Sequence, residues 1–278
     1  MPNDFKVGFL KTLWILRDYL SVIIIGGGWV PLIYYHYLLA DKSRMPIMTR
    51  DIDLFVDTRI PVVGKTLLNR LLLNAGFEPA FKSSDIPPVV HYEGIIEGQE
   101  VEIEFLTNQR GAKDDVVIEV QKGLQAEALR FLSISISHTI EVTIDDFWME
   151  GNYSPLKVKV PSPEAYIFHK GLTFGRRSDK RKKAKDLYYI FDILTNCPEL
   201  NERIIDGLRG FERKYPSWFS RFIKGLKENF SDLTADGILM VSSQRPAGAF
   251  SNLTDDMFKE FILGIFQELI EEINTIHH

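Results

Sequence analysis

The chain of 278 residues is nearly free of cysteine, with Cys197 as the only one. A single cysteine permits neither an intramolecular disulfide nor a thiolate metal cluster. The histidines inside the chain, at positions 36, 91, 138 and 169, lack the spacing of metal ligands. These absences exclude a disulfide-stapled secreted domain and a zinc-finger-type protein. We therefore expect a cytoplasmic protein.

The chain also has no excess of positive charge, since it contains 33 basic and 38 acidic residues and its net charge is −5. This balance excludes a protein that coats nucleic acid over its whole surface. It leaves room for a local basic patch. The hydrophobic content of 45% and charged content of 26% are those of a soluble globular chain.

Long uncharged runs are scarce, and the stretch from Tyr19 to Ala40 is the one that deserves comparison with a membrane span. At about 20 residues it has the length to cross a bilayer. However, it contains the glycines Gly26 to Gly28, and Pro31 follows them. A buried strand, a glycine turn and a buried helix explain it better, so we expect no membrane partner.

The remaining pattern divides the chain into two halves, 1–160 and 161–278. In the first half we expect helices over 5–20, 29–39 and 61–75, and strands over 21–25, 52–56, 89–96, 101–106, 116–120, 134–144 and 156–160. In the second half we expect helices over 163–176, 180–194, 200–215 and 254–276, with loop in part of 228–251. The expected fold class is α/β (α+β), a mixed sheet flanked by helices, followed by a helical domain.

Two carboxylates, Asp51 and Asp53, stand two residues apart in the otherwise apolar, strand-like stretch 49–57. Alternate residues of a strand share a face, so both side chains project the same way from backbone positions about 7 Å apart. At an effective dielectric near 20, their mutual repulsion is roughly 2 kcal/mol. A divalent cation would remove this repulsion, so the pair is either part of a metal site or only the solvated face of a sheet.

A third carboxylate is available from Glu102 and Glu104, which share one face of the expected strand 101–106. Carboxylates on two strands can converge on a pair of Mg²⁺ ions that bridge the phosphates of a nucleoside triphosphate. The glycine turn after the first strand would let a phosphate approach the backbone closely.

These motifs resemble the nucleotidyltransferase superfamily. The resemblance rests on the sequences Ile25-Gly-Gly-Gly28, Thr49-Arg-Asp-Ile-Asp-Leu54 and Glu102-Ile-Glu104. The later stretch from Lys170 to Lys185-Asp186 looks like the basic-helix and Lys-Asp signature of the AbiEii-like branch, which includes toxins of toxin–antitoxin pairs. Beyond about residue 200 no resemblance is found.

The resemblance implies a role for each matching residue. Asp51, Asp53 and Glu104 would be metal ligands and catalytic carboxylates, with Glu104 helping to deprotonate the acceptor hydroxyl. Glu102 competes with Glu104 for the third position, and the Glu-Phe-Leu-Thr ending slightly favours Glu104. The residues implied in nucleotide binding are Gly27, Gly28, Lys170, Lys185 and Asp186.

Three features depart from the superfamily pattern. The turn has Gly-Gly where Gly-Ser is common, which removes one hydroxyl contact to phosphate. The interval between Gly28 and Asp51 is longer than in minimal members, so a loop over 40–50 is expected. The third carboxylate is a glutamate instead of an aspartate.

The densest charge lies in the run 176–185, Arg-Arg-Ser-Asp-Lys-Arg-Lys-Lys-Ala-Lys. Such a run is either a solvated helix start or an electrostatic footprint for RNA or a triphosphate. The sequence thus predicts a Mg²⁺-dependent transferase that moves a nucleoside monophosphate to a hydroxyl of RNA, protein or a small molecule. A toxin role would bring an antitoxin partner. The alternatives are an inactive nucleotide- or RNA-binding protein on the same fold and a non-enzymatic interaction module.

Overall fold

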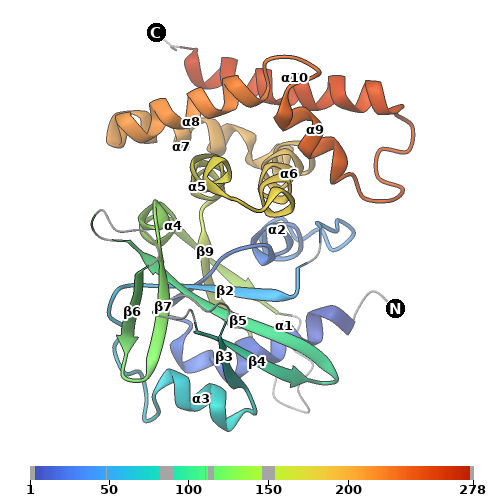
Figure 1. Ribbon diagram of the computed structural model, residues 1–278. Coiled ribbons are helices and arrows are strands. Elements are labelled where there is room, and N and C mark those ends of the chain that lie inside the picture. Colours follow the sequence, from blue (N-terminus) through green and yellow to red (C-terminus); the bar gives the residue numbers. More distant parts are fainter. Residues whose placement is uncertain are drawn as a thin grey trace. The chain divides into compact units, whose positions relative to one another are not determined.

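A computed structural model of the chain describes residues 4–47, 49–81, 90–109, 111, 116–145 and 154–275. It separates into two compact units, Met1–Ser162 and Pro163–His278. In the described residues, the first contains the strands and six short helical segments, and the second is helical (Figure 1). This arrangement confirms the expected α/β (α+β) fold class with a helical C-terminal region.

Nine strands form one mixed sheet within the described part of the first unit. They are β1 (Ile23–Ile25), β2 (Asp51–Val56), β3 (Glu78–Phe81), β4 (Val90–Ile96), β5 (Gln99–Asn108), β6 (Val116–Gln121), β7 (Leu124–Leu129), β8 (Thr139–Ile144) and β9 (Leu156–Pro161). Seven follow the order β3-β4-β5-β2-β1-β9-β8, and the β6–β7 hairpin joins through β7 to β5. Strands β2 and β5 are parallel at the centre, whereas β1 and β2 are antiparallel.

The helical segments of the first unit are short. They are α1 (Asp4–Ile15), the 3₁₀ helix η1 (Arg17–Tyr19), α2 (Trp29–Ile33), the π-helix η2 (Tyr34–Leu38), α3 (Leu68–Asn74) and α4 (Leu132–Ser137). Helix α1 packs on β4 and β5, and α4 packs on β2, β5 and β9. Figure 1 shows α1 and α3 on one side of the sheet and α4 on the other.

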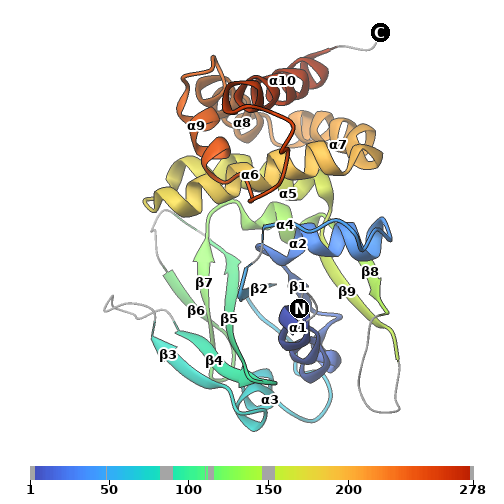
Figure 2. The same cartoon turned by 90° about the vertical axis from the view of Figure 1, so that its right-hand side faces the viewer.

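The second unit has six α-helices in its described residues. They are α5 (Pro163–Thr173), α6 (Lys180–Asn196), α7 (Asn201–Lys214), α8 (Pro216–Asn229), α9 (Asp236–Ser243) and α10 (Asp255–Asn274), with 3₁₀ turns η3 (Phe174–Arg176) and η4 (Pro198–Leu200). Figure 2 shows the neighbouring helices α5 and α6 with α10 nearby. The core is aromatic: Phe168 contacts the rings of Phe211, Phe219 and Phe222. Cys197 is buried at the end of α6.

Two expected elements in the first unit were wrong. The helix expected over 61–75 begins only at Leu68, because Gly64 adopts a φ of +71° and the Gln121 side chain holds the preceding segment. Gln121 donates to the Pro61 carbonyl, and its side-chain oxygen accepts from the Leu68 N–H at 2.7 Å. A side chain remote in sequence therefore starts this helix.

The segment 134–144, expected to be one strand, is divided between α4 and β8. Its alternation of apolar and polar residues is typical of a strand. However, Asn108 accepts a hydrogen bond from the Ser133 N–H at 3.0 Å, and Leu132 packs against Phe55. These tertiary contacts start a helical turn that the local pattern disfavours.

Other elements were missed or trimmed. Strands β3 and β7 and helices α8 and α9 were not expected. Residues 230–235 and 244–254 lie outside α-helices, which agrees with the expectation of loop in part of 228–251. The predicted helix over 5–20 ends as α1 at Ile15 and continues as η1. Residue 89 of one predicted strand and residue 276 of one predicted helix lie outside the described residues. Within the described part of the chain, no helix has both the length and the apolar character needed to span a bilayer.

Candidate active site

The sheet places the predicted carboxylates side by side. In the parallel pair β2–β5, Asp51 stands opposite Glu102 and Asp53 opposite Glu104. Neighbours in register project from the same face of a sheet, so all four carboxylates share one face. The local sequence explains this face, because the intervening residues Ile52 and Ile103 are completely buried on the other side.

Three of these carboxylates converge. One oxygen each of Asp51, Asp53 and Glu104 lies within 4.8 Å of the others. Glu104 is only 9% exposed, so its charge is held in a partly desolvated setting. Three hard oxygen donors this close together match the ligand preference of Mg²⁺ and similar cations. Charge repulsion alone would separate them, so the arrangement is suited to a bound cation.

Glu102 is turned toward the neighbouring strand β4. Its carboxylate lies 3.8 Å from Nε2 of His91, which also contacts Glu93 at 2.8 Å. Among the described residues, the close group contains Glu104 and the two aspartates, without Glu102. The geometry therefore favours Glu104 as the third carboxylate.

The glycine turn after β1 lies directly against Asp53. The Gly26 N–H donates to the Asp53 carbonyl at 2.8 Å. Gly27 has a φ of +60°, and a Cβ atom there would lie 1.8 Å from Oδ2 of Asp53. A Cβ on Gly26 would similarly collide with the Phe55 ring at 2.0 Å. Only glycine fits this close approach, after which Gly28 leads into α2.

Two supports of Asp51 were not anticipated. The Thr49 hydroxyl donates to the Asp51 carboxylate, and the indole Nε1 of Trp29 donates to its carbonyl at 3.0 Å. The Trp29 ring stacks on Phe9 with centroids 4.0 Å apart, which fixes its orientation. The spacing of Thr49 and Asp51 on alternate positions was a usable signal for the first contact. Nothing in the sequence pointed to the second.

Beyond the carboxylates, the same face of the sheet becomes apolar. Ile24, Phe55 and Leu106 form a buried cluster with Leu132 of α4. Helix α4 thus covers one part of this face next to the carboxylates and packs on both β2 and β5. A site carried by paired strands is held more precisely than one on loops.

The remaining predicted residues lie in the second unit, where they form a buried charge cluster. Nζ of Lys170 donates to Oδ1 of Asp186 at 2.5 Å, and Nε of Arg177 donates to Oδ2. Lys170 lies 5.7 Å from the Tyr189 ring, and Lys185 lies at the same distance from that ring. The structure therefore brings the three predicted residues Lys170, Lys185 and Asp186 together within this unit. Arg177 is an additional member that the sequence had shown only as part of the basic run.

Burial and charge determine the titration of this cluster. Burial raises the pKa of Asp186, but Lys170 and Arg177 more than offset it, so its pKa lies below the usual 3.8. The pKa of the neighbouring His169 is lowered to about 3, mainly by burial and secondly by the positive charge of Lys170. At neutral pH the cluster thus holds an ionised aspartate beside a neutral imidazole.

The basic run forms the start of α6. Asp179 caps the helix, since its side chain accepts from the Arg181 N–H at 2.8 Å and from the Lys182 N–H at 3.3 Å. These backbone hydrogen bonds lower the pKa of Asp179. Residues 175–182 are exposed. The run is therefore a charged surface with a defined helical geometry.

No curated protein matches the chain. Among solved structures, it is similar to the crystal structure of an antigenic nucleotidyltransferase-like protein from Paracoccidioides brasiliensis. That similarity has 20% identity, 79% coverage of this chain, 93% coverage of the other and a TM-score of 0.37.

A family model described as nucleotidyltransferase matches residues 18–200, about two thirds of the chain. The matched residues include the glycine turn, the three converging carboxylates and the Lys170–Asp186 pair. The chain belongs to this nucleotidyltransferase family.

Proposed function

We propose that the protein is an active, cation-dependent nucleotidyltransferase that moves a nucleoside monophosphate from a triphosphate to a hydroxyl and releases pyrophosphate. The observation that carries the proposal is the close approach of Asp51, Asp53 and Glu104, with oxygens within 4.8 Å. Family membership supports the reaction class.

These residues fit the divalent cations that such a reaction employs. Asp51, Asp53 and Glu104 supply oxygen donors from two paired strands, and we expect them to hold two Mg²⁺ ions. When bound, the cations would neutralise charge on the triphosphate and on the attacking oxygen. Clustered carboxylates without a cation would instead repel the triphosphate.

The side chains contribute positioning and proton transfer. A bond forms between the acceptor oxygen and the α-phosphorus while the bond from that phosphorus to the pyrophosphate oxygen breaks. In this proposal Glu104 accepts the proton of the acceptor hydroxyl. Gly27 and Gly28 allow a phosphate to approach the backbone, because the turn beside Asp53 has no side chains of its own.

Roles in nucleotide binding are proposed for Lys170, Lys185 and Asp186. Asp186 holds two cationic side chains, so the cluster formed with Lys170 and Arg177 has a net positive charge. Such a cluster suits a phosphate group. Replacement of Lys170 by Met should weaken triphosphate binding. An unchanged triphosphate affinity in this variant would contradict the proposed role of Lys170.

RNA is the acceptor that we favour over protein and small molecules. The basic run 176–185, which is exposed over 176–182, would attract a polyanion to a chain that is otherwise acidic. The AbiEii-like signature further supports a toxin role opposed by an antitoxin. Expression of the wild-type chain should then arrest growth, whereas Asp51→Ala with Asp53→Ala should not.

The acceptor can be identified with triphosphates labelled at the α-phosphate. Each of the four is incubated with Mg²⁺, the protein, and separated total RNA, protein and small-molecule fractions. Label in the RNA fraction, absent with Asp51→Ala and Asp53→Ala, is the expected result. Label in the protein or small-molecule fraction would show that the acceptor belongs to that fraction instead. Binding without any transfer would support the inactive binding protein instead.

A further inference from the structure

The corner between α7 and α8 carries an aromatic pair beyond the family-matched residues. Tyr215 and Trp218 are stacked with ring centroids 5.3 Å apart and an interplanar angle of 9°. Both side chains are partly exposed. Nζ of Lys214 lies 5.3 Å from the Tyr215 ring. Partly exposed rings next to a cation can receive a nucleobase as well as a phosphate.

Positive charge is concentrated on the same two helices. Residues 211–229 contain two acidic residues, and the five basic ones are Arg213, Lys214, Arg221, Lys224 and Lys227. All five basic residues are exposed. In a chain with a net charge of −5, this excess makes the α7–α8 segment locally basic and suited to a polyanion.

The phenylalanine of η3 connects this surface with the basic run 176–185. Nζ of Lys183 lies 5.6 Å from the Phe174 ring. On the α8 side, a Cβ atom at Gly225 would lie 3.7 Å from the same ring. The start of α6 and the middle of α8 therefore both border the buried Phe174 ring.

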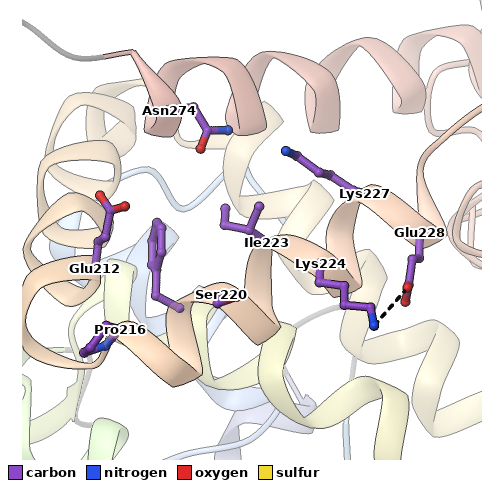
Figure 3. A pocket seen from close by; sticks show the side chains of 9 residues that line it. Glu212, Pro216, Ser220, Ile223, Lys224, Lys227, Glu228 and Asn274 are labelled. Atoms are coloured by element: carbon purple, nitrogen blue, oxygen red, sulfur yellow. Dashed lines mark ion pairs between the residues drawn. The ribbon is translucent and has the colours of Figure 1, made fainter.

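The spacing along α8 separates this surface from a second one. Trp218, Arg221 and Gly225 follow at intervals of three and four residues, so they share a helical stripe. Lys227 lies about 120° around the helix from Arg221. It lines a separate groove of about 470 Å³ between α8 and α10, with Ile223 and Asn274 (Figure 3).

We propose that this stripe and the basic run form one binding track for single-stranded nucleic acid. The track consists of the exposed part of the run 176–185, Arg221 and the Tyr215–Trp218 pair, with the buried Phe174 ring beneath it. Its cations would contact phosphates, and the aromatic pair would stack on an unpaired base. A rigid duplex keeps its bases stacked and offers none to the rings. The inference rests on the RNA acceptor of the proposed function, and it names where that RNA is held.

Binding can be measured without catalysis. Fluorescence anisotropy of a labelled oligouridylate is followed in EDTA, without triphosphate, at about 0.15 M salt, where charges beyond about 8 Å are screened. We expect saturable binding by the wild-type chain and by Asp51→Ala with Asp53→Ala. Arg221→Glu should weaken it about tenfold. Lys227→Glu has the same charge change on the other side of α8 and should alter it less than twofold. Circular dichroism verifies folding, and Lys214→Glu replaces Arg221→Glu if the latter fails to fold.

Stacking supplies a second readout. Binding should quench tryptophan fluorescence, and Trp218→Leu should remove the quenching and weaken binding at least about fivefold. Equal effects of Arg221→Glu and Lys227→Glu, no quenching, or no saturable binding would overturn the track. Equally tight binding of polyglutamate would assign the surface to an acidic protein partner instead. A chain that binds the oligonucleotide but transfers no nucleotide would refute only the proposed function.

Discussion

Gly27 and Asp53 lie so close together that a Cβ atom on the glycine would be 1.8 Å from Oδ2 of the aspartate. The glycine also has a φ of +60°, a conformation that side chains disfavour. The turn after β1 and the carboxylate on β2 are therefore one structural unit. Any side chain at Gly27 must displace the Asp53 carboxylate from its place beside Asp51 and Glu104.

Substitution of Gly27 by alanine should therefore abolish cation binding. We expect the Mn²⁺ affinity, measured by electron paramagnetic resonance, to fall at least tenfold, because Asp53 is pushed away from the other two ligands. Gly98→Ala is the matched control, since Gly98 has a φ of +74° but open space around its Cβ position. Both substitutions strain the backbone, and only the first collides with the Asp53 carboxylate. An equal loss in both variants would show that strain alone is responsible.

Neutralising one aspartate should have opposite effects with and without a cation. Asp53→Asn removes one of three neighbouring negative charges, so we expect the cation-free protein to gain about 1–2 kcal/mol. This gain corresponds to a rise in melting temperature of a few degrees. The variant should lose the additional stabilisation that Mg²⁺ gives the wild-type chain. Thermal unfolding with EDTA and with Mg²⁺ measures both effects, and a variant still stabilised by Mg²⁺ would contradict the site.

The two glutamates of β5 should behave differently. Glu104→Gln removes the charge of one of the three converging carboxylates and should abolish the stabilisation by Mg²⁺. Glu102→Gln changes a side chain that faces His91 and should preserve most of it. The pair is well matched, since both substitutions remove one charge from the same face of one strand. A reversed order in thermal unfolding would make Glu102 the ligand.

Buried His169 should make stability depend on pH. Its native pKa is about 3, while an unfolded chain has about 6.5. The unfolded state therefore binds the extra proton first as pH falls. The contribution of His169 to the free energy of unfolding is therefore fully present above pH 6.5. It is lost as the pH falls from 6.5 to about 3, by up to ~1.4 kcal/mol per pH unit. His169→Gln should make the free energy of unfolding, measured with urea, depend less on pH between pH 6.5 and 4. The Asp186 contribution is lost at lower pH, below 3.8, because its native pKa is depressed. A wild-type slope retained in the variant would refute this linkage.

The central part of the site was predictable because it depends on local patterns. Asp51 and Asp53 alternate with buried residues on one strand, and a strand has only two faces. The glycine turn after an apolar run likewise marks a backbone that something approaches closely. The structure identified that neighbour as Asp53, which the sequence could not do, because strand pairing joins residues distant along the chain.

The failures have a common cause in contacts between distant residues. Gln121 determines where α3 begins, although it lies 53 positions after Leu68. Asn108 similarly starts α4 through Ser133, against a local pattern that favours a strand. The contact between Glu102 and His91 of another strand likewise could not be read from the sequence. Local periodicity contains no information on such partners.

The most direct test of the central claim is the fate of label from two triphosphates. One is labelled at the α-phosphate and the other at the γ-phosphate, and each is incubated with Mg²⁺, the protein and total RNA. The account predicts that RNA acquires the α-label but not the γ-label, and that Glu104→Gln or EDTA abolishes the transfer. RNA labelled from the γ-phosphate, or α-labelling that persists in Glu104→Gln, would contradict it.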